Sequence, residues 1–280
     1  MILLWGIPSE SPLERVLLAL RARRAPVYLF NQRDLLDVQC DWRIQDGVLR
    51  GVLQMGGVAV SLEDVDGIYI RAMDPECLPE MRGASLDRQA QARSAHEALS
   101  TWCDLTPARV VNRLAAMGSN SSKPYQSSLL AQSGFLVPDT LVTNEPSLVR
   151  AFAARHEKVV YKSLSGARSI VRQLGPEDEA RFDRLAACPV QFQQYVDGLN
   201  IRVHVVGERV FATAVETDAV DYRYAHRDGK DATLKPVTLD DDIAERCVSA
   251  VSRLGLAFAG LDLCLTDQEE DYCFEAKPSP

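Results

Sequence analysis

The order of apolar and polar residues in the first third of the chain predicts strands and helices that alternate. ILLWG, at residues 2–6, predicts a short buried strand, and residues 9–24 form a helical pattern with Pro12 in its first turn and arginines at its end. VYLF, at residues 27–30, predicts a second strand, so the chain opens with a β-α-β unit.

Turn residues then divide a run of short alternating segments. Asp-Gly and Gly-Gly pairs interrupt residues 42–62, which predicts hairpins. A strand at residues 67–71, a helix at 85–103 and a closing strand at 109–112 complete the pattern of one α/β unit.

After a small, polar linker at residues 114–126, the pattern becomes rich in strands. Helices are predicted at residues 124–133, 145–156 and 241–254. Strands are predicted at residues 158–164, 169–174, 190–196 and 201–216, and on both sides of the acidic turn in GLDLCLTDQEEDYCFEAKP. The fold class is therefore α/β or α+β.

Composition and charge are those of an ordinary globular protein, and they restrict its partners. The chain has 280 residues, of which 46% are hydrophobic and 25% charged, and this length suggests roughly two domains. The net charge is −8 and no broad basic face can be identified, so nucleic acid is not an expected partner. No apolar run approaches the roughly 20 residues that span a membrane, and the N-terminus lacks the features of a signal peptide.

The seven cysteines are scattered along the chain and include no CxxC pair. An odd number without such pairs indicates neither a disulfide framework nor a zinc site. We therefore expect a reducing cytosol and a cytoplasmic protein. The sequence leaves the oligomeric state open, with a homodimer as one alternative.

Lys162 lies in VVYKSLSGARSIV, where a strand leads into a loop of small residues at 163–169 and a second strand follows. A phosphate chain is bound by a cation together with unhindered backbone N–H groups, which Lys162, Ser165 and Gly166 could supply. The loop lacks the GxxxxGK[ST] pattern of a Walker motif. The alternative is a β-hairpin that ends in a lysine facing solvent.

Asp262 and Glu275 are candidate metal ligands. If the acidic turn is centred between residues 268 and 269, Asp262 pairs with Glu275, and Cys264 with Cys273, across two antiparallel strands. Two opposed carboxylates are destabilising unless a cation lies between them, and oxygen ligands of this kind suit Mg²⁺. The alternative is a longer, irregular turn that breaks this register.

Basic residues in the second half of the chain are candidate anion ligands. Arg202 lies on the polar face of the predicted strand IRVHVV and could reach a phosphate, although a lone strand arginine is more often a surface or ion-pair residue. Mobile basic loops often close over anionic substrates, although surface loops are charged in any case. The predicted loop VDYRYAHRDGK contains Arg223, His226, Arg227 and Lys230.

Taken in order, these segments resemble the ATP-grasp superfamily, and within it the RimK-like ligases, from about residue 111 to residue 280. SSKPYQSSLLAQSGFLVPDTLVT is similar to the start of the central domain, and VVYKSLSGARSIV to its second lysine and phosphate loop. VQFQQYVDGLNIRVHVVGERVFA resembles the adenine hinge, and GLDL and CFEAKPSP resemble the metal-binding Asp and E-x-N-P elements. LWGIPSESPLERVLLAL, VYLFNQRD and IYIRAMDP are less specifically similar to the preceding domain of graspetide or microviridin-type ligases, which cross-link peptides through side chains.

The resemblance implies an ATP-grasp fold with an N-terminal α/β pre-ATP-grasp domain at residues 1–112. The central (lid) subdomain would span residues 123–196, and the C-terminal subdomain with the metal site would span residues 197–280. ATP and Mg²⁺ are the implied cofactors, and a small molecule or a peptide is the implied substrate.

The resemblance also implies roles for individual residues. Lys123 and Lys162 would bind the α and β phosphates of ATP, and the loop with Ser165 and Gly166 would cover them. The residues implied to hold the adenine and ribose are Gln193, Gln194, Tyr195, Val196 and Asp197.

The remaining implied roles concern the γ-phosphate and the metal ion. Arg202 and Arg223 would face the γ-phosphate or the acyl phosphate made from it. Asp262 and Glu275 would hold Mg²⁺.

Several residues depart from the family pattern. Gln194 stands where Glu is common, Asn200 where an acidic residue is common, and the phosphate loop has one glycine. Lys277 replaces the Asn that follows the metal-binding Glu275, and an ammonium opposes Mg²⁺. We expect Lys277 to pair partly with Glu275 and to impair metal binding. The alternatives are that Lys277 extends into solvent, or that it replaces one cation and contacts ATP.

The implied chemistry is a two-step ligation. ATP phosphorylates a substrate carboxylate, and an amine or hydroxyl then displaces phosphate. One alternative is a pseudo-enzyme that binds nucleotide without ligation, which the altered metal motif favours. Another is a small-molecule kinase, because a fold does not fix a reaction. The sequence does not identify the substrate or decide between an amide and an ester product.

Overall fold

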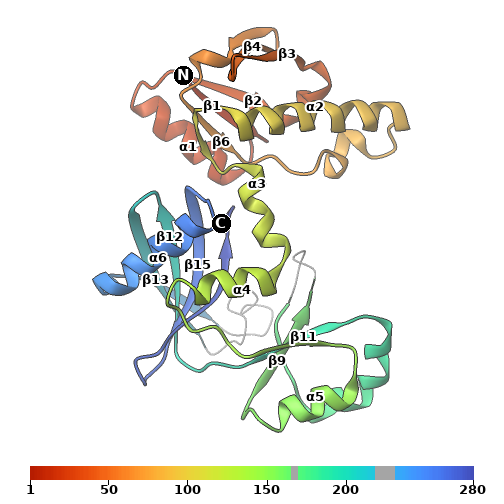
Figure 1. Ribbon diagram of the computed structural model, residues 1–280, viewed down its shortest axis with the longest axis vertical. Helices are drawn as coiled ribbons and strands as arrows, with labels where there is room; N and C mark the ends of the chain where they lie inside the picture. Colours follow the sequence, from red (N-terminus) through yellow and green to blue (C-terminus); the bar gives the residue numbers. More distant parts are fainter. Residues whose placement is uncertain (165–169, 218–230) are drawn as a thin grey trace. The chain divides into compact units, whose positions relative to one another are not determined.

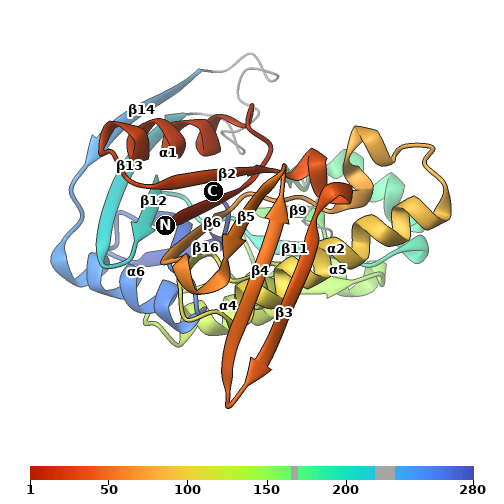
Figure 2. The same cartoon turned by 90° about the horizontal axis from the view of Figure 1, so that it is seen from above.

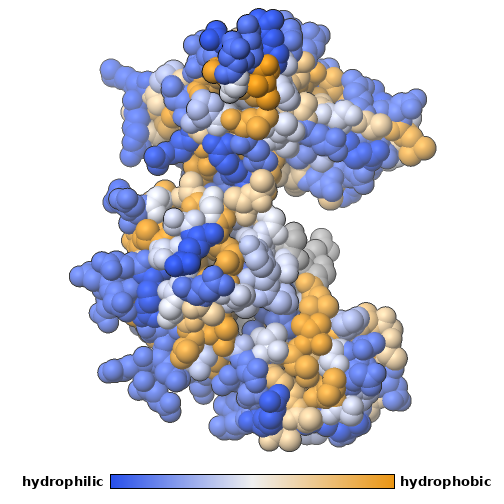
Figure 3. All heavy atoms as spheres, viewed as in Figure 1, coloured by the Kyte–Doolittle hydropathy of each residue, from blue (hydrophilic) through white to orange (hydrophobic). Residues whose placement is uncertain are grey.

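The chain forms two compact units, Met1–Ala116 and Met117–Pro280, each with its own sheets and helices (Figure 1). The computed structural model describes residues 1–164, 170–217 and 231–280. Hydrophilic residues dominate the face shown in Figure 3, with apolar patches between them. Among the residues described, no helix combines the length and the apolar character needed to cross a bilayer.

A parallel sheet in the order β2-β1-β6-β7 forms the centre of the first unit. Helix α1 packs on the face that carries Leu4, and α2 packs on the face that carries Leu3 and Trp5. Because helices cover both faces, β1 is apolar at nearly every position. The elements are β1 (Ile2–Gly6), α1 (Ser11–Ala22), β2 (Val27–Asn31), β6 (Gly67–Ile70), α2 (Leu86–Leu105) and β7 (Arg109–Val111).

A separate antiparallel sheet in this unit consists of β3 (Gln39–Gln45), β4 (Val48–Met55) and β5 (Val58–Ser61), as the Asp-Gly and Gly-Gly pairs predict (Figure 2). At the first turn Asp46 and Gly47 both have positive φ, of 53° and 76°. Two successive residues with positive φ are typical of the type I′ hairpin turn.

The second unit begins with α4 (Lys123–Ala131) and a four-stranded sheet in the order β10-β9-β11-β8. A 3₁₀ helix, Pro176–Ala187, packs with α5 on one face of this sheet, and the sequence pattern did not predict it. The strand predicted at residues 169–174 is reduced to two residues in the part of the chain that is described. The elements are β8 (Thr140–Thr143), α5 (Pro146–Ala153), β9 (Val159–Ser163), β10 (Arg172–Gln173) and β11 (Val190–Gln194).

A five-stranded sheet in the order β14-β13-β12-β15-β16 completes the second unit. Helix α6 packs on β12, β13 and β15, so that Val203 and Leu261 are fully buried. The alternate residues of these strands project from the opposite face, which α6 does not cover. The elements are β12 (Leu199–Val206), β13 (Arg209–Thr217), β14 (Ala232–Val237), α6 (Asp241–Arg253), β15 (Phe258–Leu265) and β16 (Asp271–Lys277).

The remaining helices are short. They are α3 (Leu114–Met117) and the 3₁₀ helices Gln32–Asp37, Leu62–Asp64, Pro75–Cys77, Pro79–Met81 and Gly118–Ser121. This mixture of helices and sheets confirms the predicted fold class.

Candidate active site

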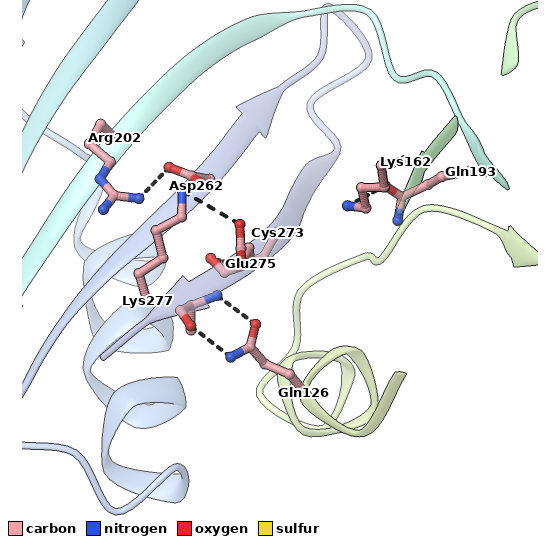
Figure 4. Close-up of polar contacts among 9 residues, drawn as sticks. Gln126, Lys162, Gln193, Arg202, Asp262, Cys273, Glu275 and Lys277 are labelled. Atoms are coloured by element: carbon pink, nitrogen blue, oxygen red, sulfur yellow. Dashed lines mark hydrogen bonds and ion pairs between the residues drawn. The ribbon is translucent and has the colours of Figure 1, made fainter. Parts of the chain in front are cut away.

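Lys162 lies on β9, on the face of the central sheet opposite to α5. Its neighbour Tyr161 packs in the apolar cluster under α5, and side chains alternate along a strand, so Lys162 projects from the other face. Lys162 Nζ donates to Gln193 Oε1 at 3.4 Å (Figure 4), and Gln193 Nε2 donates to Thr140 Oγ1 at 3.0 Å. The buried Gln193 amide therefore orients the ammonium.

The hinge at the end of β11 contains the other residues predicted to bind adenine and ribose. Gln194 N donates to Asp139 O at 2.9 Å, and Gln194 Oε1 accepts from Asp139 N at 3.4 Å. Tyr195 N donates to Lys158 O at 3.0 Å. The Lys158 ammonium lies 5.5 Å from the centre of the Tyr195 ring and 3.7 Å from Asp197 Oδ2. Lys158, which the sequence analysis did not single out, links these two hinge residues.

Two further residues were predicted to contact ATP: Val196, in this hinge, and Lys123, at the start of α4. The Val196 carbonyl accepts a weak hydrogen bond from Cys264 Sγ at 3.9 Å, which connects the hinge to β15. Lys123 is the first residue of α4 and is half-buried. The roles of both residues toward ATP stay predictions.

Arg202, Asp262 and Glu275 lie side by side on three neighbouring strands. Arg202 pairs with Asp262 and Asp262 with Glu275, and all three project from the face opposite to α6. Arg202 Nη1 donates to Asp262 Oδ1 at 2.5 Å, and Lys277 Nζ donates to Asp262 Oδ2 at 2.7 Å. Lys277 Nζ also lies 3.5 Å from Glu275 Oε2. We call Arg202, Asp262, Glu275 and Lys277 the ion-pair cluster (Figure 4).

The charges of the ion-pair cluster keep Asp262 ionised. Burial raises the pKa of the Asp262 carboxyl, but the charges of Arg202 and Lys277, with hydrogen bonds from both, outweigh burial and hold that pKa below its usual value. Each oxygen of Asp262 thus accepts from one cationic group.

An extra residue in β16 explains how Glu275 reaches this face. Asp262 pairs with Glu275, but Leu263 pairs with Cys273, so Phe274 has no opposite residue on β15 and forms a β-bulge. The bulge interrupts the alternation of side chains, so that Cys273 is buried in the core while Glu275 faces the cluster. The predicted pairing of Asp262 with Glu275 is confirmed.

The predicted pairing of Cys264 with Cys273 is wrong. Cys264 pairs with Tyr272, because the bulge shifts the register by one residue between the cluster and the turn. A pairing inferred from a symmetric turn holds only where no extra residue interrupts the strand.

Gly260 gives Arg202 the space to reach Asp262. A Cβ at this position would lie 2.7 Å from the guanidinium carbon of Arg202 and 2.7 Å from Cβ of Pro280. Glycine is therefore required for this close approach, a role that the sequence analysis missed although Gly260 begins the GLDL segment.

Gln126 on α4 fixes the outer edge of β16. Its Nε2 donates to Ala276 O at 2.6 Å and its Oε1 accepts from Ala276 N at 2.9 Å, which are the bonds that a neighbouring strand would make (Figure 4). Gln126 is buried, and Ala276 stands between Glu275 and Lys277. The sequence analysis did not identify this contact.

Solved structures with a similar fold include ATP-grasp ligases. The ATP-grasp ligase PsnB in complex with a minimal precursor has a TM-score of 0.81 and 25% identity, covering 100% of this chain and 90% of that chain. The macrocyclase MdnC from Microcystis aeruginosa MRC, bound with precursor peptide MdnA, has a TM-score of 0.80 and 22% identity, covering 100% and 92%. A RiPP-associated ATP-grasp ligase from Chryseobacterium gregarium, in complex with ADP and a leader and core peptide, has a TM-score of 0.80 and 18% identity, covering 100% and 89%. No protein-family model and no curated protein sequence matches the chain.

The chain has the ATP-grasp fold. The comparison confirms the predicted resemblance to ATP-grasp ligases, and with it the prediction of an ATP-dependent ligase. The similarity extends over the N-terminal unit, where the sequence resemblance is least specific. The narrower assignment to RimK-like ligases stays a prediction.

The ion-pair cluster of this ATP-grasp chain does not fit the predicted Mg²⁺ site. Both oxygens of Asp262 accept hydrogen bonds from cationic groups, and the Lys277 ammonium also lies beside Glu275. An ion between the two carboxylates would have to displace Lys277 or be repelled by it. Within residues 1–164, 170–217 and 231–280, no group of three or more His, Cys, Asp or Glu side chains could hold a metal ion.

The expected partner of Lys277 is corrected in part. Its ammonium does contact Glu275, as expected, but its closer partner is Asp262, because Lys277 pairs with Gly260 and extends over the neighbouring strand.

Some predicted site residues lie outside the part of the chain that is described. They are Ser165, Gly166, Arg223, His226, Arg227 and Lys230.

Proposed function

We propose that the chain is an ATP-dependent ligase that activates a carboxylate of a peptide as an acyl phosphate and joins it to an amine or a hydroxyl. The observation that carries the proposal is the structural similarity to the ligase PsnB, which covers the whole of this chain. That PsnB structure contains a minimal precursor. Another PsnB structure contains a minimal precursor, Mg and ADP, which supports ATP as the phosphoryl donor.

The ATP phosphates are proposed to lie between the Lys162 face of the central sheet and the ion-pair cluster. Lys162 and Lys123 would bind the α and β phosphates. Arg202 and Arg223 would stabilise the charge that develops on the γ-phosphate. The residues at 193–197 would hold the adenine and ribose.

The proposed reaction has two steps. A carboxylate oxygen of the substrate attacks the γ-phosphorus, the bond between the γ-phosphorus and the bridging oxygen of ADP breaks, and ADP leaves. An amine or hydroxyl then attacks the acyl carbon, and phosphate leaves as the nucleophile loses its proton. Water must be excluded from the acyl phosphate, which suits a lid made by residues 123–196 over residues 197–280.

Mg²⁺ enters this proposal as the ion that accompanies ATP, without a ligand from Asp262. Neither step depends on an ion held by Asp262 and Glu275. We further propose that the protein is cytoplasmic and that neither nucleic acid nor a membrane is its partner.

A second candidate function is nucleotide binding without ligation. The ion-pair cluster favours it, because Lys277 contacts both carboxylates that were expected to hold a metal ion. The two functions differ in their products.

Product analysis separates these functions. The protein is incubated with ATP and a pool of synthetic peptides that contain Asp, Glu, Lys, Ser and Thr, and products are analysed by mass spectrometry and nucleotide chromatography. A ligase forms ADP, phosphate and either a peptide lighter by one water or two peptides joined with the loss of one water. A phosphorylated peptide would indicate a kinase, and intact ATP with unchanged peptides would favour the binding protein.

A further inference from the structure

We propose that Lys277 supplies the positive charge that a metal ion would bring to this site, and that its ammonium contacts the phosphate chain of ATP directly. This inference rests on the proposed function, because it takes ATP to bind at the ion-pair cluster. It gives Lys277 a role in substrate binding and leaves Asp262 and Glu275 to hold that lysine in position.

The charges of the ion-pair cluster already balance. Asp262 and Glu275 carry two negative charges, and Arg202 and Lys277 carry two positive charges. Lys277 Nζ is 2.7 Å from Asp262 Oδ2 and 3.5 Å from Glu275 Oε2, so it occupies the place between the carboxylates that a bridging ion would need. A divalent ion brought to the same place would meet the ammonium at close range, which disfavours the ion.

Backbone contacts of β16 fix the position of Lys277. Ala276, the residue before it, has both backbone polar groups bonded to Gln126. On the other side Lys277 pairs with Gly260, which has no side chain to obstruct the path of the lysine toward Asp262. Lys277 is therefore fixed near the cluster although it lies close to the last residue, and the alternative that it extends into solvent does not describe its position.

The ammonium of Lys277 can serve a ligand while it keeps its carboxylate contacts. An ammonium has three N–H donors; Lys277 Nζ donates one to Asp262 Oδ2 at 2.7 Å, and Glu275 Oε2 lies 3.5 Å from the same nitrogen. The side chain is 24% exposed, so a phosphate oxygen can reach a remaining donor. Arg202 adds a second cation on the same face, and the two cations offset carboxylates that alone would repel phosphate.

The test is nucleotide binding with and without a divalent ion. The affinity for AMPPNP is measured by calorimetry in Mg²⁺ and in EDTA, for the parent protein and for Lys277→Asn. The parent should lose less than about tenfold in affinity when Mg²⁺ is removed. Lys277→Asn should lose about tenfold or more in EDTA and recover in Mg²⁺, because Asn removes a charge-assisted contact and unblocks the carboxylates.

Lys235→Asn is the matched control. Lys235 is on β14 of the same sheet, and its ammonium pairs with the exposed Glu216 at 2.7 Å. This variant should behave like the parent in both conditions, so an equal effect of both substitutions would overturn the role of Lys277.

A second measurement does not depend on whether Lys277→Asn folds. Mn²⁺ is titrated into the nucleotide-free parent and followed by electron paramagnetic resonance, with Glu275→Gln as comparison. If Glu275 held a metal ion, the parent would show a Mn²⁺ site that is absent from Glu275→Gln. We expect the parent to show no such site. Such a site in the parent would overturn the inference.

The outcomes separate this inference from the proposed function. A parent protein that binds AMPPNP only in the presence of Mg²⁺ overturns the role of Lys277 and leaves the ligase proposal standing. A parent protein that binds AMPPNP in neither condition overturns both.

Discussion

The position of the Lys162 ammonium depends on partners that are distant in sequence. Its ammonium is oriented by Gln193 on the next strand, and Gln193 is oriented by Thr140 on the strand beyond. The candidate lysine was predictable, because it ends an apolar strand before a loop of small residues. Its partners were not, because they depend on which strands pair.

Replacing Lys162 tests its proposed role as a ligand of the ATP phosphates. Lys162→Ala should weaken ADP binding by about 2 kcal/mol, because it removes a charge-assisted contact to phosphate. Calorimetry measures the change, and Lys235→Ala, on the edge strand β14, is the control. Unchanged ADP affinity in Lys162→Ala would show that Lys162 does not bind the phosphates.

At the scale of elements, β16 combines two features that no local pattern in the sequence predicts. The bulge at Phe274 places Glu275 in the ion-pair cluster, and Gln126 on α4 forms hydrogen bonds to the edge of the strand at Ala276. The sequence predicts the two strands and their acidic turn, since apolar alternation and turn residues are local signals. The bulge and the Gln126 contact follow from tertiary packing, so the register was correct at Asp262 and wrong at Cys264.

Removing the Gln126 contact should loosen β16. In Gln126→Leu the amide of Ala276 loses its acceptor, so its hydrogen exchange should be faster than in the parent by about tenfold or more. Exchange followed by mass spectrometry of peptides from residues 271–280 measures this. Gln132→Leu, at the exposed end of the same helix, should leave exchange unchanged, and equal rates in all three proteins would refute a positioning role for Gln126.

Helix α2 gives the first unit a predictable dependence on pH. Burial lowers the pKa of His96, which lies 5.1 Å from the ring of Trp5, while the carboxylates of Asp74 and Glu97 partly oppose that shift. The unfolded chain therefore binds the proton more readily than the folded chain, and the free energy of unfolding should fall as pH drops below about 6.5.

Urea unfolding between neutral pH and the acid range measures this effect. Tryptophan fluorescence reports on the first unit, because all three tryptophans, at positions 5, 42 and 102, lie within it. His96→Gln should flatten the decline below about pH 6.5, since Gln does not titrate there. The same decline in both proteins would show that other groups cause it.

For the whole molecule, the order of segments predicted the ATP-grasp fold although each motif alone was modest. Lysines, hinge and acidic strands recur in the expected sequence from about residue 111 onward, and the similarity to PsnB covers 100% of the chain. The 3₁₀ helix Pro176–Ala187 escaped prediction because its polar, acidic segment resembles a loop. The departure at Lys277 was visible in the sequence, but its preference for Asp262 depends on the path of its side chain across β15.

The most direct test of the central claim, that ATP activates a carboxylate, follows one oxygen atom. A peptide that the product analysis identifies as substrate is prepared with a heavy oxygen isotope in its side-chain carboxylates and incubated with the protein and ATP. We predict that the released phosphate carries one heavy oxygen, because the carboxylate oxygen that attacks the γ-phosphorus leaves with the phosphate when the acyl phosphate is broken down. Phosphate without the heavy isotope, released while ADP accumulates, would show that water and not the carboxylate receives the phosphoryl group, and would contradict the ligase.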